Sequence, residues 1–234
     1  MSTMTIDANA FYRLVASRRD VRGEYLPDPV PADVLARLLG AAHRAPSVGY
    51  SQPWNFILVN NAEKRRAVFR EFEASRRREA EQFDGERRTR YDRLKLEGIM
   101  TAPVNLLVTC DRSRFGPAVL GRTQQPDTDI YSTVCAIQNL WLAARCEGLG
   151  LGWVSILRPA SLKALFDLPE PVEPIAYLCL GYVSHFYPTP ELEQRGWNRR
   201  LPLAELVFQD DWGEQTTDVA LVQAIDDLSQ KAAE

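Results

Sequence analysis

The sequence predicts an α+β fold in which a central β-sheet is flanked by helices, and three observations lead to this class. Segments with helical spacing and short apolar segments typical of strands follow one another without a strict βαβ alternation. Residues 130–150 form one long helical pattern that is apolar on most sides, as expected of a core helix. Neither GxGxxG nor GxxxxGK(S/T) occurs, which argues against a Rossmann or P-loop fold.

The first half of the chain contains both helix and strand signals. Residues 32–45 place apolar side chains at helical spacing, and Pro46 ends this helix because its ring removes a backbone donor. Residues 55–60 are typical of a buried strand. Residues 63–95 are rich in Arg and Glu and predict one or two amphipathic helices, with a turn near residues 84–85.

The second half predicts three more strands around the long helix. Residues 104–110 form an apolar strand pattern, and residues 115–128 a loop. Gly148 is placed to end the long helix. Further segments follow in order: strands at 151–157 and 173–183, a short helix at 161–166 between them, and a last regular segment at 201–208 before a polar tail.

Composition limits the class of protein. The 234 residues carry a net charge of −3, with 45% hydrophobic and 25% charged residues, which is ordinary for a globular domain. This balance gives no reason to expect nucleic-acid or membrane partners, and the amino terminus lacks a secretory signal, so we expect a cytoplasmic protein. Isolated cysteines and histidines predict buried reduced thiols and no metal site: Cys110, Cys135, Cys146, Cys179, His43 and His185.

The densest charge lies in Arg18-Arg19-Asp20-Val21-Arg22. Three guanidiniums within five residues can hold a phosphate or carboxylate in bidentate geometry. The pKa of Asp20 would be lowered beside these arginines, or raised if an apolar ring removes it from water. A solvated surface cluster is the alternative interpretation, and it stays open.

A loop at residues 45–54, APSVGYSQPW, is the second candidate segment. Two prolines restrict its backbone, Gly49 lets it turn, and Ser47, Ser51 and Gln52 offer donors and acceptors. Such a loop can line the edge of a planar heteroaromatic ligand, where a few polar groups set orientation. An ordinary helix-to-strand connection explains it equally well.

Residues 148–155, GLGLGWVS, are the third candidate. Alternating glycines weaken a strand unless something approaches the backbone closely. A flat cofactor against the backbone and a helix cap followed by tight sheet packing are both consistent with them. A second basic cluster, at residues 195–200, either reaches the same anion as the first or lies on the surface.

Taken in order, these segments resemble the nitroreductase family of FMN enzymes. The similarity is closer to one subgroup, the BluB-type 5,6-dimethylbenzimidazole synthases, and runs over about residues 11–213. Each motif alone is weakly specific, whereas the ordered set is specific. The matching motifs are RRDVR at 18–22, LLGAAHRAPSVGYSQPWNF at 38–56, LKLEGI at 94–99, DIYSTVCAIQNLWLAAR at 129–145, GLGWVS at 150–155 and GWNRRLPL at 196–203.

The resemblance implies a nitroreductase-like fold with a mixed sheet, in a single domain over residues 1–234. It also implies a lid-like insertion at about 63–100 and tails at 1–10 and 214–234. The expected assembly is a homodimer with FMN at the subunit interface, and a separate flavin reductase supplies FMNH2. The implied FMN contacts are Arg18, Arg19, Arg22 and Arg199 or Arg200 at the phosphate, and Asp20, Val21, Ser47, Gly49, Gln52, Leu94, Gly152 and Ser155 at the rest of the flavin.

Asp20 separates this subgroup from ordinary nitroreductases, which usually have a serine at that position. The resemblance implies that FMNH2 is the substrate and molecular oxygen the co-substrate. Asp20 and Ser155 would be the catalytic residues as the flavin is fragmented to 5,6-dimethylbenzimidazole, the lower ligand of vitamin B12. Two alternatives stay open: an NAD(P)H-dependent nitroreductase or flavin reductase that retains its FMN, and a non-catalytic flavin carrier.

Overall fold

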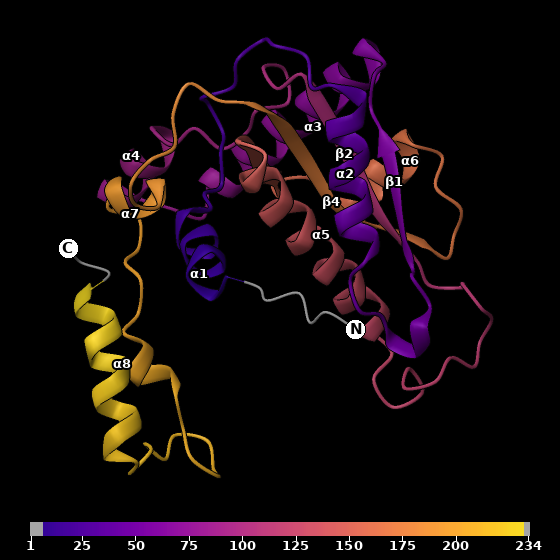
Figure 1. The fold of residues 1–234 in the computed structure, drawn as a ribbon. Coiled ribbons are helices and arrows are strands. Elements are labelled where there is room, and N and C mark those ends of the chain that lie inside the picture. Colours follow the sequence, from indigo (N-terminus) through magenta and orange to yellow (C-terminus); the bar gives the residue numbers. More distant parts are fainter. Residues whose placement is uncertain (1–6, 232–234) are drawn as a thin grey trace. The chain divides into compact units, whose positions relative to one another are not determined.

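A computed structural model describes residues 7–231, with side chains described to residue 228 (Figure 1). The chain divides into two compact units, residues 1–191 and residues 192–234. The first unit holds the sheet and the helices packed on it. The second unit holds the carboxy-terminal helix.

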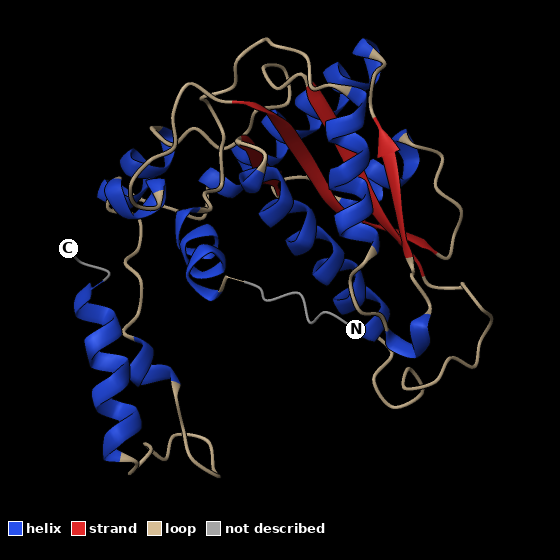
Figure 2. Ribbon diagram, viewed as in Figure 1, coloured by secondary structure: helices blue, strands red, loops and turns tan. Residues whose placement is uncertain are grey.

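The first unit is built on a four-stranded sheet in the order β1-β2-β4-β3 (Figure 2). Its strands are β1 (Trp54–Leu58), β2 (Val104–Asp111), β3 (Leu149–Val154) and β4 (Val172–Tyr182), and every neighbouring pair is antiparallel.

This sheet differs from the mixed sheet that the resemblance implied. Within residues 7–231, parallel pairing is confined to an isolated bridge between Asp20 and Leu151. Residues 155–171 connect β3 to β4 and are long enough to join two strands in either direction. The positions of the strands could therefore be predicted from the sequence, but their direction could not.

Helices cover both faces of the sheet. On one face lie α2 (Ala32–His43) and α5 (Thr128–Cys146), and on the other α3 (Ala62–Ala80) and α6 (Pro159–Leu165). Two further helices, α1 (Ala8–Ser17) and α4 (Gly85–Asp92), complete the unit. The first core contains Leu38, Leu106, Ile137 and Leu178, and the second Val68, Phe72, Leu107 and Tyr177.

The helix boundaries confirm most of the predicted elements. Asn61 is the N-cap residue of α3: its side chain accepts hydrogen bonds from the Glu63 and Lys64 amides at 2.8 and 3.1 Å. The turn at residues 81–84 separates α3 from α4, as expected. Gly148 follows α5 with a φ of 76°, the left-handed conformation that ends a helix.

The second unit corrects the expectation of a polar tail. A helix, α8 (Val219–Lys231), fills most of residues 214–234, and Asp218 caps it by accepting a hydrogen bond from the Leu221 amide at 3.0 Å. Leu221, Ile225 and Leu228 follow a helical spacing, so the sequence contained a helix signal that the expectation of a polar tail overlooked. The regular segment expected at 201–208 is reduced to a 3-10 turn, η2 (Leu203–Leu206), and a short helix, α7 (Glu191–Gln194), lies at the boundary of the units.

Two further expectations concern membranes and thiols. None of the helices described in residues 7–231 is long and apolar enough to cross a membrane. Cys110 and Cys179 are buried free thiols, as expected. The expectation was wrong for Cys135 and Cys146, which are exposed because they lie on the outward side of α5.

Candidate functional site

The segment Arg18–Arg22 runs along the open edge of β3. The Val21 amide donates a hydrogen bond to the Leu151 carbonyl at 3.1 Å, and Asp20 forms its isolated bridge with the same residue. β3 is the last strand in the sheet order, so this edge has unpaired backbone groups for the segment to use. The arginine segment is thereby fixed to the sheet through its backbone.

Asp20 is held by contacts to both carboxylate oxygens. Its Oδ1 accepts a hydrogen bond from the Trp153 amide of β3 at 3.0 Å, and its Oδ2 pairs with Arg22 Nη2 at 2.5 Å. The side chain stays 27% exposed. Burial beneath the surrounding chain raises the pKa of Asp20 more than Arg22, the Trp153 amide and Arg18 lower it. Asp20 therefore takes up a proton more readily than an ordinary aspartate, as a general acid or base requires.

The three arginines of the segment differ in what they contact. Arg19 donates through Nε to the Tyr187 carbonyl at 2.9 Å and through Nη1 to the Ala16 carbonyl at 2.7 Å. Arg22 pairs with Asp20. The Arg18 guanidinium lies 4.8 Å from the centre of the Trp141 ring and forms no ion pair within residues 7–231. Arg18 is thus the best placed of the three to bind an anion.

The glycines of β3 leave room for Val21 of the same chain to pack against the strand. A Cβ on Gly152 would lie 1.9 Å from the Val21 carbonyl oxygen, and one on Gly150 would lie 2.9 Å from Val21 Cγ2. Of the two explanations that the sequence left open, tight packing accounts for this close approach. The predicted contact between Gly152 and the flavin ring stays a prediction.

The loop at residues 47–52 has an unusual backbone. Gly49, Tyr50 and Gln52 have positive φ angles of 53°, 55° and 41°, a conformation that is rare for residues other than glycine. The Ser47 hydroxyl accepts a hydrogen bond from the Gln52 amide at 3.0 Å. The Ser51 hydroxyl is buried and has no hydrogen-bond partner within the described residues. A buried polar atom without a partner costs free energy, so a bound water molecule or a ligand that enters the loop would stabilise it.

Residues 112–122 pack against this loop, and no residue of that segment was singled out from the sequence. A Cβ on Gly49 would lie 2.7 Å from Val119 Cγ1 and 2.8 Å from the Leu120 carbonyl oxygen. Arg114 Nη1 donates to the Gln52 carbonyl at 2.5 Å and to the Trp54 carbonyl at 3.1 Å. The guanidinium of Arg114 therefore holds the end of the loop where it enters β1.

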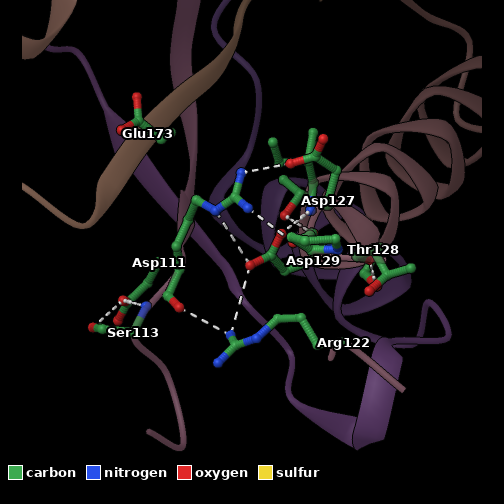
Figure 3. A network of polar contacts seen from close by, with 12 residues as sticks. Asp111, Ser113, Arg122, Asp127, Thr128, Asp129 and Glu173 are labelled. Atoms are coloured by element: carbon green, nitrogen blue, oxygen red, sulfur yellow. Dashed lines mark hydrogen bonds and ion pairs between the residues drawn. The ribbon is translucent and has the colours of Figure 1, made fainter. Parts of the chain in front are cut away.

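A buried ion network holds residues 112–122 in turn (Figure 3). Asp129, in the first turn of α5, is completely buried, and its Oδ2 lies 3.5 Å from Arg112 Nε and 3.6 Å from Arg122 Nη1. Arg122 also donates to the Arg112 carbonyl at 2.9 Å. The only signal in the sequence was the pair of acids, Asp127 and Asp129, at the start of an apolar helix.

The structure ties the remaining predicted site residues less closely to the Arg18–Arg22 segment and the 47–52 loop. Ser155 is exposed at the end of β3, and it borders a hollow of about 200 Å³, smaller than the roughly 300–1,000 Å³ of ordinary ligand pockets. Leu94 is buried in the chain's own interior, 5% exposed. Arg199 and Arg200 are exposed in the second unit. Asp20, through its hydrogen bond to the Trp153 amide, and Ser155 thus both lie near the carboxyl end of β3, whereas contacts of the late arginines with FMN stay a prediction.

Comparisons with known proteins add three findings. The model of the nitroreductase family matches residues 15–182. Two relatives, both 5,6-dimethylbenzimidazole synthases, come from Rhodospirillum rubrum (44% identity, 79% of this chain and 87% of the relative) and Rhodobacter capsulatus (39% identity, 83% and 93%). The fold is similar to that of iodotyrosine deiodinase bound to FMN and 3-iodo-L-tyrosine, with a TM-score of 0.66, 23% identity, and coverage of 86% of this chain and 98% of that one.

Proposed function

The chain belongs to the nitroreductase family, and we propose that it is a 5,6-dimethylbenzimidazole synthase. It is an oxidoreductase whose substrate is reduced FMN and whose product is the lower ligand of vitamin B12. Relatives with this name match about four-fifths of the chain. The observation that carries the proposal is the carboxyl of Asp20, which has a raised pKa and is fixed between Arg22 and the Trp153 amide.

The donors around Asp20 and in the 47–52 loop fit FMN. Arg18, whose charge is not compensated by an ion pair in residues 7–231, is suited to the phosphate together with Arg22. Gln52 and the unsatisfied hydroxyl of Ser51 are suited to the polar edge of the ring. When bound as FMNH2, the flavin supplies both the reducing electrons and the carbon atoms of the product.

In this proposal each side chain at the end of β3 has a separate task. The Trp153 amide fixes Oδ1 of Asp20, so that proton exchange occurs at Oδ2. Arg22 orients that oxygen, and the raised pKa lets it accept and release a proton during fragmentation. The exposed hydroxyl of Ser155 orients the flavin or its side chain. Molecular oxygen is the oxidant.

We also propose a homodimer that completes the site. Apolar side chains of α1 and α5 are exposed, and a surface of this kind is typical of an interface. A second copy on that surface would add the walls that one chain lacks around the flavin. Light scattering after size exclusion, with and without FMN, tests this: a monomer at micromolar concentration would contradict it. The exposed side chains are Phe11, Tyr12, Val15, Tyr131 and Val134.

The test of the proposed function uses the protein with chemically reduced flavin. We expect that anaerobic incubation with FMNH2, followed by air, yields 5,6-dimethylbenzimidazole and a loss of total flavin. In this assay a chemical reductant produces FMNH2. It takes the place of the separate flavin reductase that we expect to supply FMNH2 in the cytoplasm. Complete return of FMN without product would contradict the proposal. Steady NAD(P)H oxidation with a nitroaromatic would then favour a nitroreductase, and tight FMN binding without turnover a flavin carrier.

A further inference from the structure

Tyr25 occupies a slot directly behind the Arg18–Arg22 segment. A Cβ on Gly98 would lie 2.4 Å from Tyr25 Cε2, one on Gly181 would lie 3.3 Å from Cδ1, and one on Gly152 would lie 3.1 Å from the hydroxyl oxygen. These glycines come from three separate parts of the chain. A side chain at Gly98 would require the ring to move, so the slot is shaped for an aromatic ring.

The hydroxyl of Tyr25 lies between two backbone carbonyls. It is 3.0 Å from the Val21 carbonyl oxygen and 2.7 Å from that of Cys179, in the middle of β4. Burial raises the pKa of Tyr25 well above its ordinary value, so the hydroxyl keeps its proton and remains a donor. The hydroxyl has a single proton, which the two carbonyls share, and Tyr25 thereby links the arginine segment to an inner strand of the sheet.

The Val21 carbonyl is the backbone group that this hydroxyl can orient. Val21 stands between Asp20 and Arg22, and its carbonyl oxygen fills the space that Gly152 leaves open. Within residues 7–231, the Tyr25 hydroxyl is the one donor that forms a hydrogen bond to this oxygen. Rotation of the peptide after Val21 would move the backbone of Arg22, whose side chain pairs with Oδ2 of Asp20.

Resting on the proposed function, we infer that Tyr25 is a positioning residue: its hydroxyl fixes the Val21 carbonyl and so aligns Asp20 and Arg22 for fragmentation of the flavin. Its loss should therefore affect the fate of the flavin more than its binding. FMNH2 would still be oxidised by oxygen, but a smaller share would become 5,6-dimethylbenzimidazole.

The test compares Tyr25→Phe with Tyr177→Phe. Tyr177 is a matched control because its hydroxyl donates to Asn105 Oδ1 at 2.9 Å on the same sheet, without touching the arginine segment. For Tyr25→Phe we expect about fivefold less product per FMNH2 oxidised, as the loss of one hydrogen bond allows. In the FMN-free protein, amide exchange in residues 18–25 should become about tenfold faster. The control should change neither quantity. Wild-type product yield and exchange in Tyr25→Phe would overturn the inference.

Two features of the experiment distinguish failure of this inference from failure of the proposed function and from misfolding of the variant. Wild-type protein that makes no product contradicts the proposed function, whereas the exchange rates still test the role of Tyr25. If Tyr25→Phe does not fold, a fluorinated tyrosine at position 25 keeps the ring shape and acidifies the hydroxyl. In the folded variant, amide exchange in residues 18–25 and the product yield should stay within about twofold of the wild type, because the hydroxyl donor is kept. A loss of yield with unchanged exchange would overturn the inference.

Discussion

The Arg18–Arg22 segment and the 47–52 loop are both predicted to contact FMN, but they are fixed in different ways. The first is held by backbone contacts to β3 and by the absence of side chains at Gly150 and Gly152. The second is held by the guanidinium of Arg114 and, through residues 112–122, by the buried ion network around Asp129.

We propose that this difference separates the region that places the reacting carboxyl of Asp20 from a region that contributes to binding alone. A backbone held against a sheet keeps the main chain at Asp20 in place through contacts that carry no net charge. A loop held by ionised side chains depends on their charges and can adjust when a ligand enters. We therefore expect changes near β3 to alter the reaction and changes in the ion network to alter flavin affinity.

The largest effect should come from Gly152→Ala. The new methyl group would lie 1.9 Å from the Val21 carbonyl oxygen, a backbone atom that cannot yield without moving the arginine segment. We expect a loss of about 3 kcal/mol in the free energy of unfolding and no product formation. Chemical denaturation and the product assay measure the two effects.

Gly40→Ala is the control for this substitution. Gly40 lies in α2 with nothing within 4 Å of the new methyl group, so alanine should stabilise the protein by roughly 0.5–1 kcal/mol. If both variants had the same stability, the close approach at Gly152 would not constrain the fold.

Asp129→Asn should have the next largest effect, and mainly on flavin affinity. The amide leaves Arg112 and Arg122 without their shared buried partner, which should cost about 2 kcal/mol of stability. Residues 112–122 should loosen against Gly49, and FMN should bind about tenfold more weakly in a fluorescence titration. Asp127→Asn, at an acid that is 57% exposed, should change either quantity by less than about 1 kcal/mol. Equal effects of the two variants would contradict a special role for the buried acid.

The smallest effect concerns Glu71 of α3, which forms a two-point ion pair with Arg158 just after Ser155, at 2.8 and 2.9 Å. Arg158 lowers the pKa of Glu71 from 4.5 to about 2. A lowered pKa in the folded state stabilises the protein above pH 4.5, and this contribution is lost as the pH falls toward 2. Because Arg158 is 60% exposed, the loss should be only about 1 kcal/mol. Acid denaturation measures this: the stability of Glu71→Gln should not show the extra loss between pH 4.5 and 2. If the stability of the wild type and of Glu71→Gln fell in parallel with pH, the role of the ion pair would be contradicted.

Local features of the fold were predictable because they depend on neighbouring residues. Pro46, the turn near residue 84 and Gly148 mark helix ends by their own conformational limits. The direction of β4 relative to β3 depends on a long connection and could not be predicted. Helix α8 was missed although Leu221, Ile225 and Leu228 recur at helical spacing, because the polar residues before it predicted a polar tail to the end of the chain.

At the candidate site, the sequence indicated a cluster of charge and a close approach of the backbone. It did not indicate which residues contact one another there. Nothing in the pattern RRDVR distinguishes Arg19, which binds backbone carbonyls, from Arg18, which does not. The glycines of β3 predicted a close approach, but only the structure identifies Val21 as the group that approaches. The Asp129 network joins residues distant in sequence to the loop at Gly49, and no local pattern predicts such a contact.

The most direct test of this account is the product yield of Asp20→Asn. Asparagine keeps the size of the side chain and a hydrogen bond from Trp153, but it cannot exchange a proton. We predict that the variant binds FMN and reoxidises FMNH2 in air, while its yield of 5,6-dimethylbenzimidazole falls about 100-fold. A yield equal to that of the wild type would contradict the central claim that Asp20 directs the flavin toward fragmentation.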